Sequence, residues 1–272
     1  MIIQFINYIR TVRAYSPCTC KAYEKDLKHF AAWARENMTD ARWSKITKEV
    51  IDNYIADAVR NEQKPATTNR RLASLSAYYR WLGYQGYKVE NPCRYESRRK
   101  VAKTVPNTIS TKELRTAYEH TDGALHVMLG LLMYSGIRIS ELLALEWHDI
   151  DTEKNTIRVK GKGSKERVIH VPAECLTEIR TAKSRCGKNG VMFQYSDRYA
   201  RKIIHEALRE YCQAPQLSPH AIRHTFATNL AAHDVNVSTI SRILGHEHLE
   251  TTQKYIDLAA AQNTLAAVTH AM

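Results

Sequence analysis

The stretch that decides the fold reads Thr156-Ile-Arg-Val-Lys160, then Gly161-Lys-Gly-Ser-Lys165, then Glu166-Arg-Val-Ile-His-Val171. Two short runs rich in β-branched residues flank a loop with two glycines, and this pattern predicts a β-hairpin. It is the one clear β signal, because apolar residues elsewhere recur mostly at helical spacing. The sequence therefore predicts a mainly α-helical protein with one small antiparallel β-sheet, an α+β fold.

Helical patterns fill the first ninety residues. Ser16-Pro17 is typical of a helix start with proline in the first turn, and further helices are predicted over 47–61 and 66–82. The polar, basic stretch 94–103 has no apolar period and is typical of a linker. A chain of 272 residues is long enough for two modest domains. We therefore expect a helical domain over 1–100, with the basic linker at its end, and a second domain over 101–272.

The charge of the chain points to a polyanionic partner. The formal net charge is +12 and the pI is near 9.4. Residues 1–100 carry 19 Lys/Arg against 10 Asp/Glu, and residues 101–272 carry 21 against 18. Nucleic acid is the most economical explanation of this excess, although basic surfaces also occur for solubility alone.

Composition also bears on the compartment. No apolar run reaches the length of about 18 residues that a membrane-spanning helix needs, and the N-terminus lacks the pattern of a signal peptide. The six cysteines show neither zinc-site spacing nor a disulfide framework. We therefore expect reduced thiols and a cytoplasmic protein without a membrane partner.

Several polar residues of the second half suit a phosphate. Arg138 lies in the turn of Ser135-Gly-Ile-Arg-Ile-Ser-Glu-Leu142, before a helix whose expected N-cap is Ser140, and Glu141 follows on the same helix edge. Helix N-termini favour anions, so an arginine there suits a phosphate. Lys162 occupies the hairpin tip, with Lys160 and Lys165 as weaker candidates for the same role. Each residue alone is as readily explained by an ordinary exposed side chain.

A second group follows Ser218-Pro219, which predicts another capped helix. His220 and Arg223 are three residues apart, so their side chains lie on adjacent turns and can reach one phosphate. His246 follows Gly245, which is typical of a left-handed residue at a helix end, and Tyr255 comes nine residues later.

A zinc site is the alternative for these histidines, since His220 and His224 are four residues apart and His246 and His248 lie downstream. However, Arg223 places a positive charge beside the first pair, and no glutamate occupies the HExxH position. We therefore expect no metal and no other cofactor.

Together and in this order, these strings resemble the tyrosine site-specific recombinases, the family of phage integrases and Xer-type resolvases. The resemblance implies DNA cleavage and religation without metal or ATP, in which Tyr255 attacks phosphorus and Lys162 protonates the leaving 5′ oxygen. It implies a 3′-phosphotyrosyl intermediate and a Holliday junction, as in integration, excision or resolution. The catalytic residues would be Arg138, Lys162, His220, Arg223, His246 and Tyr255, supported by Glu141.

The resemblance extends to the N-terminal part. Ser16-x-x-Thr19-x-x-x-Tyr23-x-x-Asp26-Leu27 and Thr67-x-x-Arg70-x-Leu72-x-x-Leu75 are similar to the core-binding, SAM-like domain of simple recombinases. It implies a C-shaped clamp on DNA, formed by a core-binding domain over 1–100 and a catalytic domain over 101–272. The expected DNA contacts of the first domain are Lys64, Thr67 and Arg70.

The implied partner is double-stranded DNA with a specific recombination site, bound by a homotetramer on synapsed DNA, and the protein would associate with the nucleoid when bound. After Tyr255 comes an amphipathic tail that in this family packs on a neighbouring protomer, although packing on its own domain suits the sequence equally. Its apolar residues are Ile256, Leu258, Ala259, Ala260, Leu265, Ala266 and Val268.

Two other functions share parts of this pattern. A type IB-like topoisomerase would use the same six residues but would only relax supercoils. A DNA-binding regulator could use the segment from Ser238 to Tyr255 as a helix-turn-helix around Gly245. Such a regulator would not need Arg138, Lys162 or Arg223, and their joint presence favours the enzyme.

Overall fold

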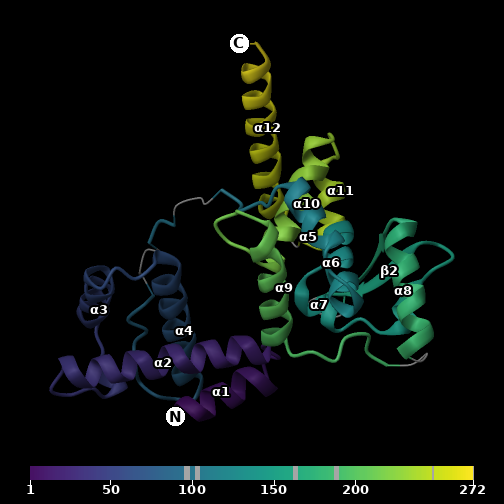
Figure 1. The fold of residues 1–272 in the computed structure, drawn as a ribbon. Helices are drawn as coiled ribbons and strands as arrows, with labels where there is room; N and C mark the ends of the chain where they lie inside the picture. The colour runs from purple at the N-terminus through teal and green to yellow at the C-terminus, as the bar shows by residue number, and fades with distance from the viewer. Residues whose placement is uncertain (95–98, 102–104, 162–164, 187–189, 247, 272) are drawn as a thin grey trace. The chain divides into compact units, whose positions relative to one another are not determined.

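The computed structural model describes residues 1–94, 99–101, 105–161, 165–186, 190–246 and 248–271. The chain divides into two compact units, Met1–Lys103 and Thr104–Met272 (Figure 1). The fold is largely helical with one small antiparallel sheet, which confirms the predicted α+β class.

Helices and their connecting loops make up the first unit within its described residues. Ser16 caps α2, where its hydroxyl accepts a hydrogen bond from the Thr19 amide at 3.2 Å, and Thr47 caps α3 in the same way. Aromatic side chains at helical spacing form the core, among them the fully buried Tyr54 and Tyr78. The elements are α1 (Ile2–Thr11), α2 (Pro17–Asn37), η1 (Trp43–Lys45), α3 (Lys48–Arg60) and α4 (Pro65–Tyr84).

The second unit places eight α-helices around the small sheet within its described residues. Helix α6 is its centre, because apolar side chains on all its faces are buried and it packs against α5, α7, α8, α9 and α10. The helices are α5 (Thr111–Glu119), α6 (Gly123–Ser135), α7 (Ile139–Leu143), α8 (Ala173–Cys186), α9 (Asp197–Tyr211), α10 (Pro219–Ala232), α11 (Val237–Leu244) and α12 (Glu250–Ala271).

The sheet contains the predicted hairpin. Strands β2 (Thr156–Lys160) and β3 (Glu166–His170) pair antiparallel, with Ile157 opposite Ile169. A short strand β1 (Ile150–Asp151) follows the 3₁₀ turn η2 (Trp147–Asp149) and pairs with β2 on the side opposite β3. Two residues are too few to show a period in the sequence, so β1 was not predicted.

Three helices near the C-terminus share a small core of their own. Side chains of α10, α11 and α12 meet there, and α12 (yellow in Figure 1) continues beyond the other two. Tyr255 lies on this helix of 22 residues. The members of this core include Ala227, Ile240, Leu244, Tyr255 and Ala259.

Among the described residues, none of the helices combines the length and the apolar character needed to cross a bilayer.

Candidate active site

The turn before α7 fixes the position of Arg138. Helix α6 ends at Gly136, whose φ of 59° and ψ of 23° lie in the left-handed region. A Cβ at this position would lie 2.4 Å from Cδ1 of Phe226, so both the backbone and the packing require glycine. Helix α7 then begins directly after Arg138, which is its N-cap.

The expected cap at Ser140 was therefore wrong. The carboxylate of Glu141 reaches back and accepts the Arg138 backbone N–H at 3.0 Å, so the N-cap lies two residues earlier than expected. A glutamate three residues into a helix can provide this contact without any serine.

Glu141 joins two arginines. Its Oε1 accepts from Nη1 of Arg138 at 2.8 Å, and both its oxygens accept from Arg167 of β3, at 3.1 and 2.8 Å. The glutamate is only 7% exposed. Burial opposes its ionisation, but the hydrogen bonds from Arg167 and Arg138 outweigh burial and lower the pKa of Glu141. This buried anion holds both guanidinium groups in place.

Arg223 of α10 forms hydrogen bonds to the backbone of two separate turns. It is 3% exposed, and it donates to the carbonyl oxygens of Gly136 at 2.6 Å and of Leu244 at 2.7 Å. Burial, and then the charge of Arg138, lower the pKa of Arg223 to about 10, so it is still cationic at neutral pH. A buried positive charge therefore lies between the turn of Arg138 and the turn of His246.

His246 follows Gly245, whose φ of 66° confirms the predicted left-handed helix end. Nη2 of Arg138 donates to the Gly245 carbonyl at 3.0 Å, and Nδ1 of His246 lies 2.8 Å from the hydroxyl of Thr252. Burial, and then the charges of Arg223 and Arg138, lower the pKa of His246 to about 3. His246 is therefore a neutral imidazole at neutral pH.

Tyr255 lies beside these groups but is enclosed. It is 1% exposed, its ring centroid is 6.3 Å from that of His246, and its hydroxyl lies 2.8 Å from Nδ1 of His224. Burial raises the pKa of the Tyr255 phenol, while Arg223 and Arg138 act in the opposite direction.

His220 is the more exposed histidine of α10. Its ring centroid is 6.1 Å from that of His224, one turn further along the helix. Burial, and then the charge of Arg223, lower the pKa of His220.

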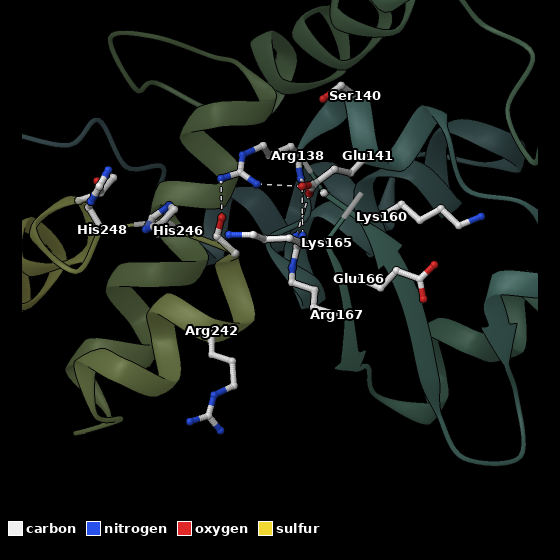
Figure 2. Close-up of a pocket in the computed structure, with 13 residues that line it drawn as sticks. Arg138, Ser140, Glu141, Lys160, Lys165, Glu166, Arg167, Arg242, His246 and His248 are labelled. Atoms are coloured by element: carbon white, nitrogen blue, oxygen red, sulfur yellow. Dashed lines mark hydrogen bonds and ion pairs between the residues drawn. The ribbon is translucent and has the colours of Figure 1, made fainter. Parts of the chain in front are cut away.

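A basic cavity of about 870 Å³ opens beside Arg138 and His246. Figure 2 shows Lys165 extending from the hairpin toward His246, while Lys160 points away. The cavity is large enough for a phosphodiester and is suited to one by charge. Its lining residues are Arg138, Ser140, Glu141, Lys160, Gly161, Lys165, Glu166, Arg167, Arg242, Gly245, His246, His248 and Thr251.

The structure thus brings most of the proposed set into one region of the second unit. Arg138, Arg223, His246 and Tyr255 are linked through contacts of the Gly136 and Gly245 turns. Lys162 lies outside the described residues, but Gly161 and Lys165 on either side of its loop line the cavity. In the same unit, the described residues contain no cluster of three or more His, Cys, Asp or Glu that could hold a metal ion.

Sequence reasoning missed Arg167 as a member of this region. A signal was present, because residues two apart on a strand share a face, and Arg167 has the parity of the apolar Ile169 and Val171. An arginine at an inward position predicts a buried anionic partner. That partner, Glu141, is 26 residues away in the chain.

The three expected DNA contacts of the first unit lie at the start of α4. Lys64 is exposed at its N-cap, and Thr67 is half-buried. Arg70 forms an ion pair with Asp26 of α2, a carboxylate that is 2% exposed. Arg70 therefore has a structural partner within its own unit.

Comparison with known proteins covers both units. A family model described as Phage integrase family matches residues 107–262, and one described as Phage integrase, N-terminal SAM-like domain, matches residues 2–86. The tyrosine recombinase XerC of Halalkalibacterium halodurans is 27% identical over 92% of this chain and 90% of its own length. That of Pelobacter propionicus is 29% identical over 92% and 88%.

Solved structures share the fold. The XerH recombinase bound to a palindromic difH substrate in a post-cleavage complex superposes with a TM-score of 0.77 at 17% identity, over 98% of this chain and 84% of that one. A lambda integrase (75–356) dimer bound to a COC′ core site gives 0.73 at 16% identity, over 94% and 93%.

Proposed function

This chain belongs to the phage integrase family of tyrosine site-specific recombinases, and from that membership we propose how its residues cut and rejoin DNA. The observation that carries the proposal is the convergence of Arg138, Arg223, His246 and Tyr255 on one region from α7, α10, α11 and α12. These residues lie up to 117 positions apart in the chain, from 138 to 255.

The scissile phosphate occupies the basic cavity in this proposal. Arg138, whose side chain is 33% exposed, donates to the non-bridging oxygens. The buried Arg223 contributes a positive charge near the phosphate. Glu141, itself held by Arg167, keeps the guanidinium of Arg138 oriented. The arginines therefore stabilise the charge that develops on phosphorus without needing to move.

His246 supports the same oxygens as a neutral donor. If the Thr252 hydroxyl donates to Nδ1, the ring proton resides on Nε2 and that N–H is free to bond a phosphate oxygen. A pKa near 3 keeps this tautomer uncharged throughout the physiological range.

Tyr255 is the nucleophile. Its phenol must lose a proton as the bond to phosphorus forms, and a phenol with a pKa above 10 is scarcely ionised at pH 7. His220, whose lowered pKa keeps it neutral at pH 7, accepts or shares that proton, while Arg138 and Arg223 favour the anion. The product is a 3′-phosphotyrosyl ester that retains the energy of the broken bond.

Lys162 protonates the departing 5′ oxygen, a role commonly worth about 10² to 10⁴ in rate. Gly161 and Lys165, which flank its segment in the sequence, line the cavity, and this supports the role. Religation reverses the two steps, so neither a metal ion nor ATP is required.

The two units divide the binding of DNA between them. We assign core binding to residues 1–100 and catalysis to residues 101–272, arranged as a clamp on a duplex with a specific recombination site. Lys64, Thr67 and Arg70 contact DNA from the first unit. The excess of nine positive charges in residues 1–100, 19 Lys/Arg against 10 Asp/Glu, supports this division.

Recombination joins four subunits on two synapsed duplexes through a Holliday junction in this proposal. The start of α12 packs on its own unit, where Tyr255 and Ala259 are buried against α10 and α11. The end of α12 continues beyond those helices, and we propose that it packs on a neighbouring protomer.

The decisive experiment mixes two DNA molecules that each carry the recombination site. Recombinant products, formed in EDTA and without nucleotide, are expected from this chain and absent from the Tyr255→Phe variant. Relaxation of supercoils without any joined product would favour the topoisomerase alternative, and site binding without either reaction would favour a regulator.

A further inference from the structure

The hydroxyl of Tyr255 has a specific partner that the proposed chemistry does not use. It lies 2.8 Å from Nδ1 of His224, which belongs to α10, whereas Tyr255 belongs to α12. Tyr255 is 1% exposed and is not among the residues that line the basic cavity. The reactive oxygen is therefore held inside the small core of α10, α11 and α12.

The geometry of α10 separates His224 from the phosphate-binding side. Arg223, the preceding residue, directs its guanidinium to the Gly136 and Leu244 carbonyls, close to the cavity. His224 lies about 100° further round the helix and faces Tyr255 instead. One helix thus presents the buried cation to one side and the partner of the nucleophile to another.

The proton of this contact stays on the phenol. Burial, and then the charge of Lys254, lower the pKa of His224 to about 4, while burial raises the pKa of Tyr255 above its ordinary value of 10. A histidine with so low a pKa is a very weak base toward a phenol. His224 therefore accepts a hydrogen bond from Tyr255 but does not remove its proton.

We propose that His224 is a positioning residue that holds the Tyr255 hydroxyl in a resting place outside the cavity, so that attack on phosphorus requires this hydrogen bond to break. The inference rests on the proposed role of Tyr255 as the nucleophile. A neutral hydrogen bond of this kind shifts an equilibrium by roughly 2- to 13-fold. His224 thus sets the fraction of molecules in which the nucleophile is free to engage DNA.

The central test removes the acceptor and keeps a ring of similar size. At saturating protein, His224→Phe is expected to raise the rate of first covalent attachment to a nicked suicide duplex by roughly 2- to 13-fold. In free protein, acetylation of the Tyr255 oxygen by N-acetylimidazole, followed by peptide mass spectrometry, is expected to rise in parallel. A residue needed only for packing would lower the rate instead.

Two amide variants separate the hydrogen bond from the ring. Asparagine at position 224 places its amide oxygen near the position of Nδ1, whereas glutamine places it near Nε2. His224→Asn is therefore expected to react close to the wild-type rate, and His224→Gln to react as fast as His224→Phe. If the phenylalanine variant fails to fold, the comparison of asparagine with glutamine decides the question.

A matched control lies in the first unit, where Nδ1 of His29 is 3.0 Å from the hydroxyl of Tyr54. His29→Phe removes an equivalent contact far from Tyr255 in the chain and is expected to leave the attachment rate unchanged. A folded His224→Phe variant that attaches at the wild-type rate or more slowly would overturn the positioning role. Covalent product from Tyr255→Phe would instead overturn the assignment of the nucleophile.

Discussion

Arg167 and Glu141 form a two-pronged ion pair, with Nη1 to Oε1 at 3.1 Å and Nη2 to Oε2 at 2.8 Å. Both side chains are nearly buried, 11% and 6% exposed. Paired N–H···O bonds of this geometry fix orientation as well as charge. Since Glu141 also accepts from Arg138, the guanidinium proposed to bind the phosphate is oriented by strand β3 through one carboxylate.

The first prediction removes the charge of that carboxylate. Glu141→Gln leaves two arginines without their buried anion, so it should lower the free energy of unfolding by about 3 kcal/mol. It should also slow cleavage about tenfold, because Arg138 is no longer held. Urea unfolding and single-turnover cleavage measure the two effects. Glu166→Gln, at an exposed position of β3, should change stability by less than about 0.5 kcal/mol, and equal losses of stability in both variants would argue against the network of Glu141 with the two arginines.

Tyr255→Phe tests the nucleophile itself. The variant retains the ring that packs in the small core, so it should bind the recombination site with unchanged affinity. It should never become attached to a nicked suicide duplex in EDTA, because it has no oxygen to attack phosphorus. Denaturing gels detect the protein–DNA adduct, and its appearance in the variant would identify another nucleophile.

Lys162→Ala tests the acid. The variant should cleave a normal phosphodiester about 10² to 10⁴ times more slowly, because the alkoxide leaves without a proton. A substrate with sulfur at the 5′ bridging position has a better leaving group and should restore most of that rate. Arg223→Ala should not be rescued, since its loss concerns charge on the phosphate.

The neighbouring lysines provide the controls for this experiment. Lys160→Ala and Lys165→Ala should cleave the normal substrate faster than Lys162→Ala and show no selective rescue by sulfur. If Lys162→Ala is equally impaired on both substrates, Lys162 is not the acid, and these two residues, both of which line the cavity, are the next to test.

Lys64 and Arg70 should respond differently to alanine. Lys64→Ala should weaken DNA binding and reduce its salt dependence, with stability unchanged, because Lys64 is an exposed cap residue. Arg70→Ala should weaken binding and also lower stability by about 1–3 kcal/mol, because Asp26 loses its partner while buried. Binding across a salt series and thermal unfolding separate the two results, and unchanged affinity of both variants would exclude them as DNA contacts.

Two half-buried histidines, His224 and His246, predict a loss of stability in mild acid. His224 and His246 have pKa values of about 4 and 3 in the folded protein, against 6.5 when unfolded. Below pH 6.5 the unfolded chain therefore binds protons that the folded chain does not, and stability falls as the pH is lowered from about 7 to 4. The melting temperature of His246→Gln should depend less on pH over this range. If the melting temperatures of the variant and the wild type depend on pH to the same extent, the lowered pKa of His246 is contradicted.

Local signals carried most of what could be predicted. The hairpin, the cap at Ser218 and the left-handed Gly245 depend on a few neighbouring residues, so the sequence shows them. The contacts of His224 with Tyr255, and of Arg70 with Asp26, join helices 31 and 44 residues apart. Their partners are set by how helices pack, which no local pattern reports. The cap of α7 was missed because the N-cap is Arg138, whose amide donates to Glu141, and not the expected Ser140.

Helix α12 carries both the proposed nucleophile, Tyr255, and the end that is proposed to pack on a neighbouring protomer. Its 22 residues run without interruption from Glu250, five positions before Tyr255, to Ala271, and a helix of this length is about 33 Å long. Tyr255 lies near the start of the helix, where it is buried against α10 and α11, and the helix continues for 16 residues beyond it, from 256 to 271. If the far end packs on a neighbouring protomer, as proposed above, a rotation of the helix imposed there would also turn Tyr255 about the helix axis.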